Sequence, residues 1–213
     1  MSARGRGTKP QKDEFYSTPA WAVNRLLDHL GVPLLQQVVT AVEPCAGDGA
    51  IVGAVDNWFW DHGQACPIWT THDIVDRSPG GRFSIRDIRE PVVARLGSYY
   101  GLCITNPPFS LALEAAMFGI WCARTTCLLL RLNWLEAGGA RTLARRAFLE
   151  RHPPAVLVLP NRPAFVGGTT DSTAYAWFCW GPGTENGRIS LLANTPIAER
   201  RLDRPRSVAM VAA

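Results

Sequence analysis

Apolar residues recur along the chain at two different spacings, and their alternation predicts an α/β fold. From Thr18 to Gly31 they follow the helical period, with Thr18 as N-cap and Pro19 in the first turn. Short apolar runs bounded by glycine, proline or polar residues predict buried strands between further helices. The seven expected strands are Val38–Val42, Ile68–Thr71, Leu102–Thr105, Thr126–Leu132, Ala155–Leu159, Ala174–Trp180 and Ile189–Ala193. The other expected helices are Ala50–His62, Ser110–Ala123 and Ala140–Arg151.

Strands that alternate with helices form a mostly parallel sheet covered on both faces, and ligands bind at the C-terminal ends of such strands. The expected strand Ala174–Trp180 carries large apolar groups at both parities, so it belongs in the interior of the sheet. The loop before it, Gly167–Asp171, is too short to hold a crossover helix. We therefore expect this strand, near the C-terminal end, to run antiparallel to its predecessor.

The length and composition of the chain fit a single folded domain with polar ends. Its 213 residues are 47% apolar and 19% charged, which is enough apolar surface for one core. We expect a flexible basic arm over residues 1–14, a globular domain over 15–195 and a basic C-terminal tail over 196–213. Basic ends bind phosphate backbones by releasing counterions, although solvated tails that only aid solubility have the same composition.

Several classes of protein are disfavoured by the same sequence. No apolar run reaches the roughly 18 to 20 residues that cross a bilayer, and Met1–Lys12 lacks the apolar core of a signal peptide. We therefore expect a cytoplasmic protein that does not bind membranes. The six cysteines are never spaced as CxxC, which favours buried thiols over a zinc site or a disulfide framework. The four histidines form no metal-ligand or triad pattern, so neither metal-dependent nor covalent catalysis is indicated.

The first motif with chemical content is EPCAGDG, which spans Glu43 to Gly49 between an expected strand and an expected helix. Gly47 and Gly49 allow a sharp turn and a close approach of the backbone to a ligand. Glu43 and Asp48 would repel a phosphate, and the loop lacks the glycine patterns of P-loops and dinucleotide-binding loops. An acidic loop suits a ligand that carries an ammonium group, such as S-adenosylmethionine. A glycine turn needed only for packing is the alternative.

The second motif, Asn106-Pro107-Pro108-Phe109, follows the strand expected at Leu102–Thr105. The prolines remove two amide donors and fix the backbone, so a carbonyl beside Asn106 can point outward as an acceptor. An amine placed between that carbonyl and the Asn106 side-chain oxygen would donate both protons and aim its lone pair at an electrophile. Phe109 offers a flat face for a base, worth about 1 to 3 kcal/mol by analogy with single-strand binders. A plain proline turn is the alternative.

Together and in this order, the two motifs resemble those of S-adenosylmethionine-dependent amino-methyltransferases, specifically the DNA adenine-N6 group, whose pattern is Asn/Asp-Pro-Pro-Tyr/Phe. The segment Asp13–Pro19 looks like the N-terminal cofactor motif of members in which that motif precedes the glycine loop. The stretch Arg162–Trp177 is similar to small phage and prophage methyltransferases. The resemblance covers Phe15 to about Trp180. It implies that residues 15–195 form a Rossmann-like class I methyltransferase catalytic domain.

The resemblance also implies which residues bind the cofactor S-adenosylmethionine. Asp73 would accept hydrogen bonds from the ribose hydroxyls, with Asp76 as runner-up because the spacing departs from the commoner acidic-x-Asp pattern. Asp87 would bind the adenine amine of the cofactor, although either aspartate is also plausible as a surface turn residue. The residues expected around the amino-acid moiety of the cofactor are Tyr16, Thr18, Pro19, Glu43, Ala46, Gly47 and Gly49.

A third group of residues is expected to meet the substrate. The set Asn106-Pro107-Pro108-Phe109 would carry catalysis, and Phe165 would form the second wall of the base pocket unless it is simply a core phenylalanine. Arg141 and Arg145 lie one helical turn apart and would hold DNA phosphates.

The reaction implied by the resemblance is methyl transfer from S-adenosylmethionine to the N6 amine of adenine in DNA, by direct in-line displacement after base flipping. The same acceptor pair would hold any planar amine, so N6-adenine methylation of RNA and N5-glutamine methylation of a protein stay open. The basic arm argues mildly against a protein substrate. An inactive nucleic-acid-binding domain of the same fold is a further alternative, against which the intact Asn106–Phe109 set argues. We expect DNA as partner, no metal, and a monomer or weak dimer.

Overall fold

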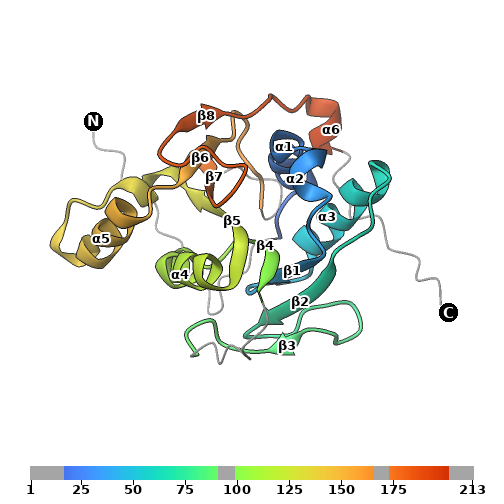
Figure 1. Cartoon of the computed structure of the whole chain (residues 1–213), viewed down its shortest axis with the longest axis horizontal. Helices are drawn as coiled ribbons and strands as arrows, with labels where there is room; N and C mark the ends of the chain where they lie inside the picture. The colour runs from blue at the N-terminus through green and yellow to red at the C-terminus, as the bar shows by residue number, and fades with distance from the viewer. Residues whose placement is uncertain (1–16, 91–98, 166–172, 202–213) are drawn as a thin grey trace.

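A central eight-stranded sheet organises the part of the chain described by the computed structural model, residues 17–90, 99–165 and 173–201 (Figure 1). The strand order is β3-β2-β1-β4-β5-β7-β6-β8. Neighbouring strands are parallel except that β7 runs antiparallel to both β5 and β6. The strands are β1 Thr40–Glu43, β2 Ile68–Asp73, β3 Ser84–Ile85, β4 Tyr100–Thr105, β5 Ala123–Arg131, β6 Ala155–Val158, β7 Tyr175–Trp180 and β8 Ile189–Leu191.

Helices cover both faces of this sheet. Helices α1 and α3 pack on one face in the largest core cluster, and α4 packs on the other face in a second cluster. Figure 1 shows the two groups on opposite sides of the strands. The helices are α1 Ala20–Leu30, α2 Val32–Leu35, α3 Ala50–Asp61, α4 Ala112–Cys122, α5 Leu143–Arg151 and α6 Ile197–Arg201. Short 3₁₀ turns are η1 Phe109–Leu111, η2 Leu132–Leu135 and η3 Ala140–Thr142.

The expected α/β class, the mostly parallel sheet and the antiparallel strand near the C-terminal end are confirmed. Every residue of β7 is buried, as its apolar side chains at both parities predicted. The expected number of seven strands was wrong by one. The additional strand, β3, has only two residues and both are exposed, so no apolar run marks it in the sequence.

The start of the first helix also differs from the expectation. Pro19 is the N-cap of α1, and no side chain caps the helix. The hydroxyl of Thr18 instead accepts a hydrogen bond from Asn106, which lies 88 residues further along the chain. Thr18 therefore connects the beginning of α1 to the end of β4.

Close packing of α4 on β5 depends on a glycine. A Cβ atom built on Gly119 would lie 2.3 Å from Cγ2 of Thr126, which is far inside van der Waals contact. In α3, by contrast, a Cβ atom on Gly53 would meet nothing within 4 Å. The missing side chain at Gly119 thus sets the distance between this helix and the sheet.

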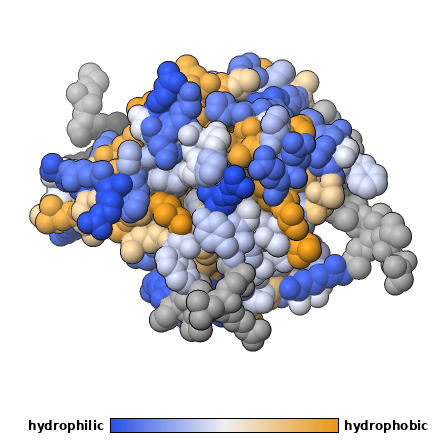
Figure 2. Space-filling model, in the orientation of Figure 1, coloured by the Kyte–Doolittle hydropathy of each residue, from blue (hydrophilic) through white to orange (hydrophobic). Residues whose placement is uncertain are grey.

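The segment expected to be a basic tail begins with ordered structure. Helix α6 is connected to α1 through Arg25 of α1. Its Nε atom donates to Thr195 Oγ1, just before α6, at 3.0 Å, and its guanidinium forms an ion pair with Glu199 of α6. The expected arm at residues 1–14 and the end of the tail lie outside the described residues. None of the helices within the described ranges is both long and apolar enough to cross a bilayer. In Figure 2, hydrophilic residues are interspersed with hydrophobic ones over the face in view.

Candidate functional site

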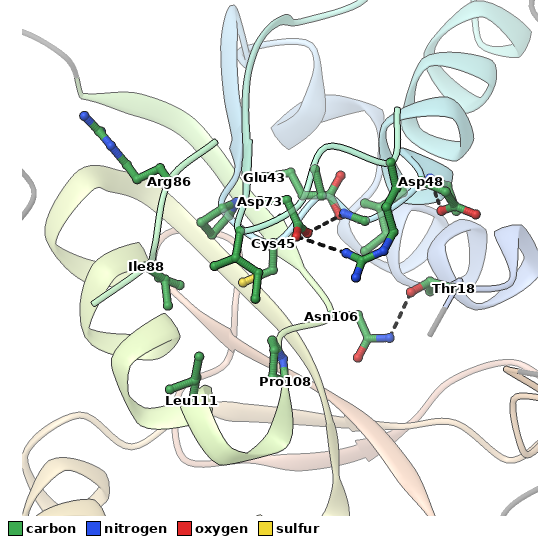
Figure 3. A pocket seen from close by; sticks show the side chains of 17 residues that line it. Thr18, Glu43, Cys45, Asp48, Asp73, Arg86, Ile88, Asn106, Pro108 and Leu111 are labelled. Carbon is green, nitrogen blue, oxygen red and sulfur yellow. Dashed lines mark hydrogen bonds and ion pairs between the residues drawn. The ribbon is translucent and has the colours of Figure 1, made fainter. Parts of the chain in front are cut away.

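The C-terminal ends of β1, β2 and β4 open on one cavity (Figure 3). Strands β1 and β4 are neighbours, but β1 is followed along the chain by β2 on its other side. A reversal of this kind creates the crevice in which open α/β sheets bind ligands. The cavity is lined by Thr18, Glu43, Pro44, Cys45, Ala46, Gly47, Asp48, Ala50, Ile51, Asp73, Ile74, Arg77, Arg86, Ile88, Asn106, Pro108 and Leu111.

The glycine loop after β1 is held against the end of β2. Gly47 and Gly49 have φ angles of 55° and 81°, a region that favours glycine. The amide of Ala46 donates to the carbonyl of His72 at 2.8 Å, and the amide of Gly47 donates to Asp73 Oδ2 at 2.7 Å. These bonds fix the loop backbone along the floor of the cavity.

Glu43 is the most unusual carboxylate in the cavity. It is only 1% exposed, and within the described residues its Oε2 atom has no hydrogen-bond partner. Burial raises the pKa of Glu43 well above its ordinary value, and the nearby charges of Asp48 and Asp73 raise it further. A buried acceptor of this kind suits a ligand that brings a positively charged donor.

Asp73 ends β2 and lines the cavity, as the expected ribose-binding residue should. Its carboxylate accepts hydrogen bonds from Gly47 and from the amide of Val75 at 3.1 Å, and it pairs with Arg77 at 3.3 Å. The runner-up, Asp76, does not belong to the lining. Its Oδ1 atom accepts the amide of Ser78 at 2.9 Å, which gives it a role in the following turn.

Asp87, expected near the adenine of the cofactor, is not among the lining residues. Its carboxylate accepts three hydrogen bonds from the side chain of Arg89 and one from the Arg89 amide, and together these lower the pKa of Asp87 to about 2. Its neighbours Arg86 and Ile88 line the cavity instead. The expected segment is therefore at the site, but the side chains that face the cavity are the adjacent ones.

Asn106, at the end of β4, lines the opposite side of the cavity from Glu43 (Figure 3). Its Nδ2 atom donates to Thr18 Oγ1 at 3.0 Å, and Thr18 is only 5% exposed. Because the amide nitrogen donates to Thr18, the carbonyl oxygen of the same planar amide points away from Thr18. Pro108 also lines the cavity, whereas Pro107 is buried beside it.

Beside the cavity, aromatic side chains gather around Phe109. The ring of Tyr175 lies 6.0 Å from that of Phe109 and 5.0 Å from that of Phe165, measured between centroids. The guanidinium carbon of Arg131 lies 4.4 Å from the Phe109 centroid. The sequence therefore identified two of the rings, Phe109 and Phe165, and missed Arg131 and Tyr175.

The two arginines expected to hold phosphates differ in their surroundings. Arg141 is exposed in η3, whereas Arg145 is half-buried and donates to the carbonyl of Glu136 at 2.6 Å. Arg145 thus supports the loop after η2. Pro19 is not in the cavity lining, and Tyr16 lies outside the described residues.

The thiols of all six cysteines are free, and four of them are buried. The expectation of buried thiols was wrong for Cys66, which is exposed, and Cys45 is half-buried in the cavity lining. Across the described ranges, no three or more histidine, cysteine or acidic side chains are placed to hold a metal ion.

The residues of the cavity lining that no motif had marked share a property. Arg77, Arg86 and Ile88 reach the cavity through turns after β2 and β3, and Leu111 reaches it through η1. No motif marks these positions. The only available signal was their short distance in sequence from Asp73 and Asn106.

Comparison with known proteins gives matches only at the level of structure: no family model matches the chain, and neither does any curated protein sequence. The methyltransferase subunit of a type I restriction-modification system from Streptococcus thermophilus matches with a TM-score of 0.62 at 11% identity, over 89% of this chain and 53% of that one. The type I restriction enzyme EcoKI M protein, EC 2.1.1.72, matches with a TM-score of 0.54 at 14% identity, over 84% of this chain and 47% of that one.

A proposed RNA methyltransferase from Pyrococcus horikoshii also matches, with a TM-score of 0.51 at 12% identity, over 83% of this chain and 91% of that one. The chain spans about half the length of the two restriction-modification proteins. At these identities the matches establish architecture and not activity. The chain therefore has the fold of the class I S-adenosylmethionine-dependent methyltransferases.

Proposed function

We propose that the protein transfers a methyl group from S-adenosylmethionine to the N6 amine of adenine in DNA. One observation carries this proposal: a buried carboxylate, Glu43, and an oriented amide, Asn106, end neighbouring strands and face a common cavity. The first suits the ammonium of an amino acid, and the second suits a planar amine.

The residues around the glycine loop fit the cofactor. The unpartnered Oε2 atom of Glu43 would accept a hydrogen bond from the cofactor ammonium, which would also offset the cost of burying that carboxylate. Asp73 would accept a ribose hydroxyl in place of, or beside, its contact with Arg77. Ile88 and Leu111 would pack against the adenine. When bound, the cofactor supplies an electrophilic methyl group on a sulfonium.

The residues around Asn106 fit the acceptor amine. The hydrogen bond with Thr18 gives the acceptor role to the Asn106 carbonyl oxygen, which would receive one amine proton. A main-chain carbonyl in the proline-rich turn would receive the other. These contacts strengthen as the nitrogen becomes tetrahedral, so they favour the transition state over the ground state. Direct in-line transfer would need no general base before attack.

DNA is the proposed nucleic acid. Adenine N6 lies inside a duplex, so the target nucleotide would be flipped out at a cost of a few kcal/mol, offset by stacking on Phe109 and Phe165. Two of the matched structures come from restriction-modification enzymes, which supports DNA over other substrates. The match to a proposed RNA methyltransferase, which covers most of that chain, makes adenine in RNA the second candidate.

Methyl transfer to separate substrate pools tests the proposal. The protein is incubated with radiolabelled S-adenosylmethionine and with DNA, RNA or protein, and the products are digested and separated. We expect label in N6-methyladenine from DNA, and none with Asn106→Ala. An Asp76→Ala variant serves as the control, because its side chain lies outside the cavity lining. Label confined to RNA would replace the substrate, and cofactor binding without any transfer would favour an inactive binding domain.

A further inference from the structure

Arg131 is placed where a substrate base is expected, although no motif marks it. It is the last residue of β5, whose neighbour β4 leads into Asn106 and Phe109. Its guanidinium carbon lies 4.4 Å from the centroid of the Phe109 ring, a distance typical of cation–π stacking. Its Nε atom donates to Tyr175 Oη at 3.2 Å, and the two residues are partners in the β5–β7 register.

The surroundings of Arg131 are those of a base pocket rather than of the protein surface. Tyr175 is buried and contacts both Phe109 and Phe165, so the guanidinium lies among rings contributed by three different segments. Phe109 itself packs partly against both core clusters. A guanidinium and a nucleobase are both planar and stack on aromatic faces. A flipped base that stacked on this face of Phe109 would therefore compete with the Arg131 side chain.

We propose that Arg131 covers the stacking face of Phe109 in the free enzyme, and that an incoming base displaces its guanidinium onto the backbone phosphate of the flipped nucleotide. This inference rests on the proposed function. A guanidinium moved out of an aromatic cluster needs an anion, and the flipped nucleotide brings one attached to the same sugar as its base. Arginine binds phosphate through two parallel N–H donors, so the exchange keeps the charge compensated.

The position of Arg131 at a strand end makes the movement feasible. It is half-buried at the rim, so the side chain reaches solvent without a change in the strand. Its role is to bind and position the substrate, because it does not touch the reacting amine. The matched control is Arg124, an exposed arginine near the other end of the same strand. The two lie seven positions apart, or about 23 Å along an extended strand, and an odd separation places them on opposite faces.

The test compares Arg131→Gln, Arg131→Lys and Arg124→Gln in DNA binding over a range of salt concentrations. For Arg131→Gln we expect a DNA dissociation constant raised about tenfold. A plot of the logarithm of the DNA association constant against the logarithm of salt concentration should become less steep by about 0.9, the value for one phosphate contact. Cofactor affinity should stay unchanged, and the melting temperature should fall by only a few degrees because one cation–π contact and one hydrogen bond are lost. Arg131→Lys should keep the wild-type slope because it keeps a point charge, and Arg124→Gln should match wild type.

A second measurement uses wild-type protein and does not depend on the folding of a variant. One DNA carries a neutral methylphosphonate in place of the phosphate beside the target adenine. Wild type should bind this DNA about tenfold more weakly than unmodified DNA, whereas Arg131→Gln should bind the two DNAs equally well. An Arg131→Gln enzyme with reduced kcat or melting temperature but an unchanged salt slope would overturn the inference, since Arg131 would then only support Phe109. A wild-type enzyme that transfers no methyl group to DNA would refute the proposed function instead.

Discussion

Replacing Glu43 by glutamine should have opposite effects on the free protein and on cofactor binding. Burial and two neighbouring carboxylates raise the pKa of Glu43, so its charged form opposes folding. The stability linked to this group is fully present below the ordinary glutamate pKa and is lost as pH rises through the raised pKa. Glutamine keeps the shape and cannot ionise. The free Glu43→Gln protein should therefore be more stable than wild type at neutral and alkaline pH.

The expected magnitudes follow from the missing hydrogen-bond partner of Oε2. Glutamine still places a polar atom at this position but removes the buried charge that has no partner there, which is worth about 1 to 3 kcal/mol. At about 2 to 4 °C per kcal/mol for a chain of this size, the melting temperature should rise by several degrees. Loss of a charged hydrogen bond to the cofactor ammonium costs about 1.5 to 3 kcal/mol, a roughly 10- to 150-fold higher dissociation constant.

Thermal unfolding between about pH 5 and 9, with and without cofactor, measures both the stability of the free protein and the stabilisation by the cofactor. Wild type should lose stability with rising pH in the absence of cofactor, and saturating cofactor should restore it. Glu43→Gln should lose no stability through this group as pH rises, and a given cofactor concentration should stabilise it less than wild type because it binds more weakly. The control is Glu185→Gln, since Glu185 is exposed and paired with Arg188 at the surface. A Glu43→Gln protein that is less stable than wild type and binds the cofactor normally would refute the reasoning.

Three further predictions follow from the same geometry. Asn106→Ala should abolish methyl transfer while cofactor affinity, measured by calorimetry, stays within several-fold; equal loss of both would contradict the division of roles. Asp73→Ala should weaken cofactor binding by about 1.5 to 3 kcal/mol, whereas Asp76→Ala should not, and the reverse result would exchange their assignments. Gly119→Ala should lower stability by about 1 to 3 kcal/mol in denaturant unfolding because its methyl group would overlap Thr126. Gly53→Ala in open helix should raise it by up to about 1 kcal/mol, and similar effects at both glycines would exclude the packing explanation.

The two central motifs could be located from sequence because local chemistry defines them. Glycine permits the positive φ angles of a sharp turn, and paired prolines restrict their own backbone. The apolar runs before both motifs mark buried strands. Since parallel strands place their C-terminal ends at the same edge, Glu43 and Asn106 were expected to face one crevice. The structure places both in the lining of one cavity.

The contacts that complete the site depend on tertiary packing, which no local pattern encodes. Thr18 had a satisfactory local interpretation as a helix cap, yet its hydroxyl pairs with Asn106. Asp87 lies in the expected segment, but the pairing with Arg89 directs it away from the cavity and leaves Ile88 there. Arg131 and Tyr175 meet only through the register of two antiparallel strands.

The three carboxylates of the cavity differ in how they are compensated, and this difference bears on what the cavity selects. Asp48 accepts the amide of Ala50 at the start of α3, and Asp73 is bound by Gly47, Val75 and Arg77. Both therefore have partners before any ligand arrives. Glu43 retains a buried oxygen that no described residue satisfies. The negative charges of Asp48 and Asp73 also act on this carboxyl group. An anionic ligand would meet these three carboxylates beside Arg77 and Arg86, which also line the cavity, whereas an ammonium next to Glu43 would compensate the one carboxylate oxygen that no described residue satisfies. The Glu43 end of the cavity thus suits a cationic amino-acid group, which supports S-adenosylmethionine as the proposed cofactor.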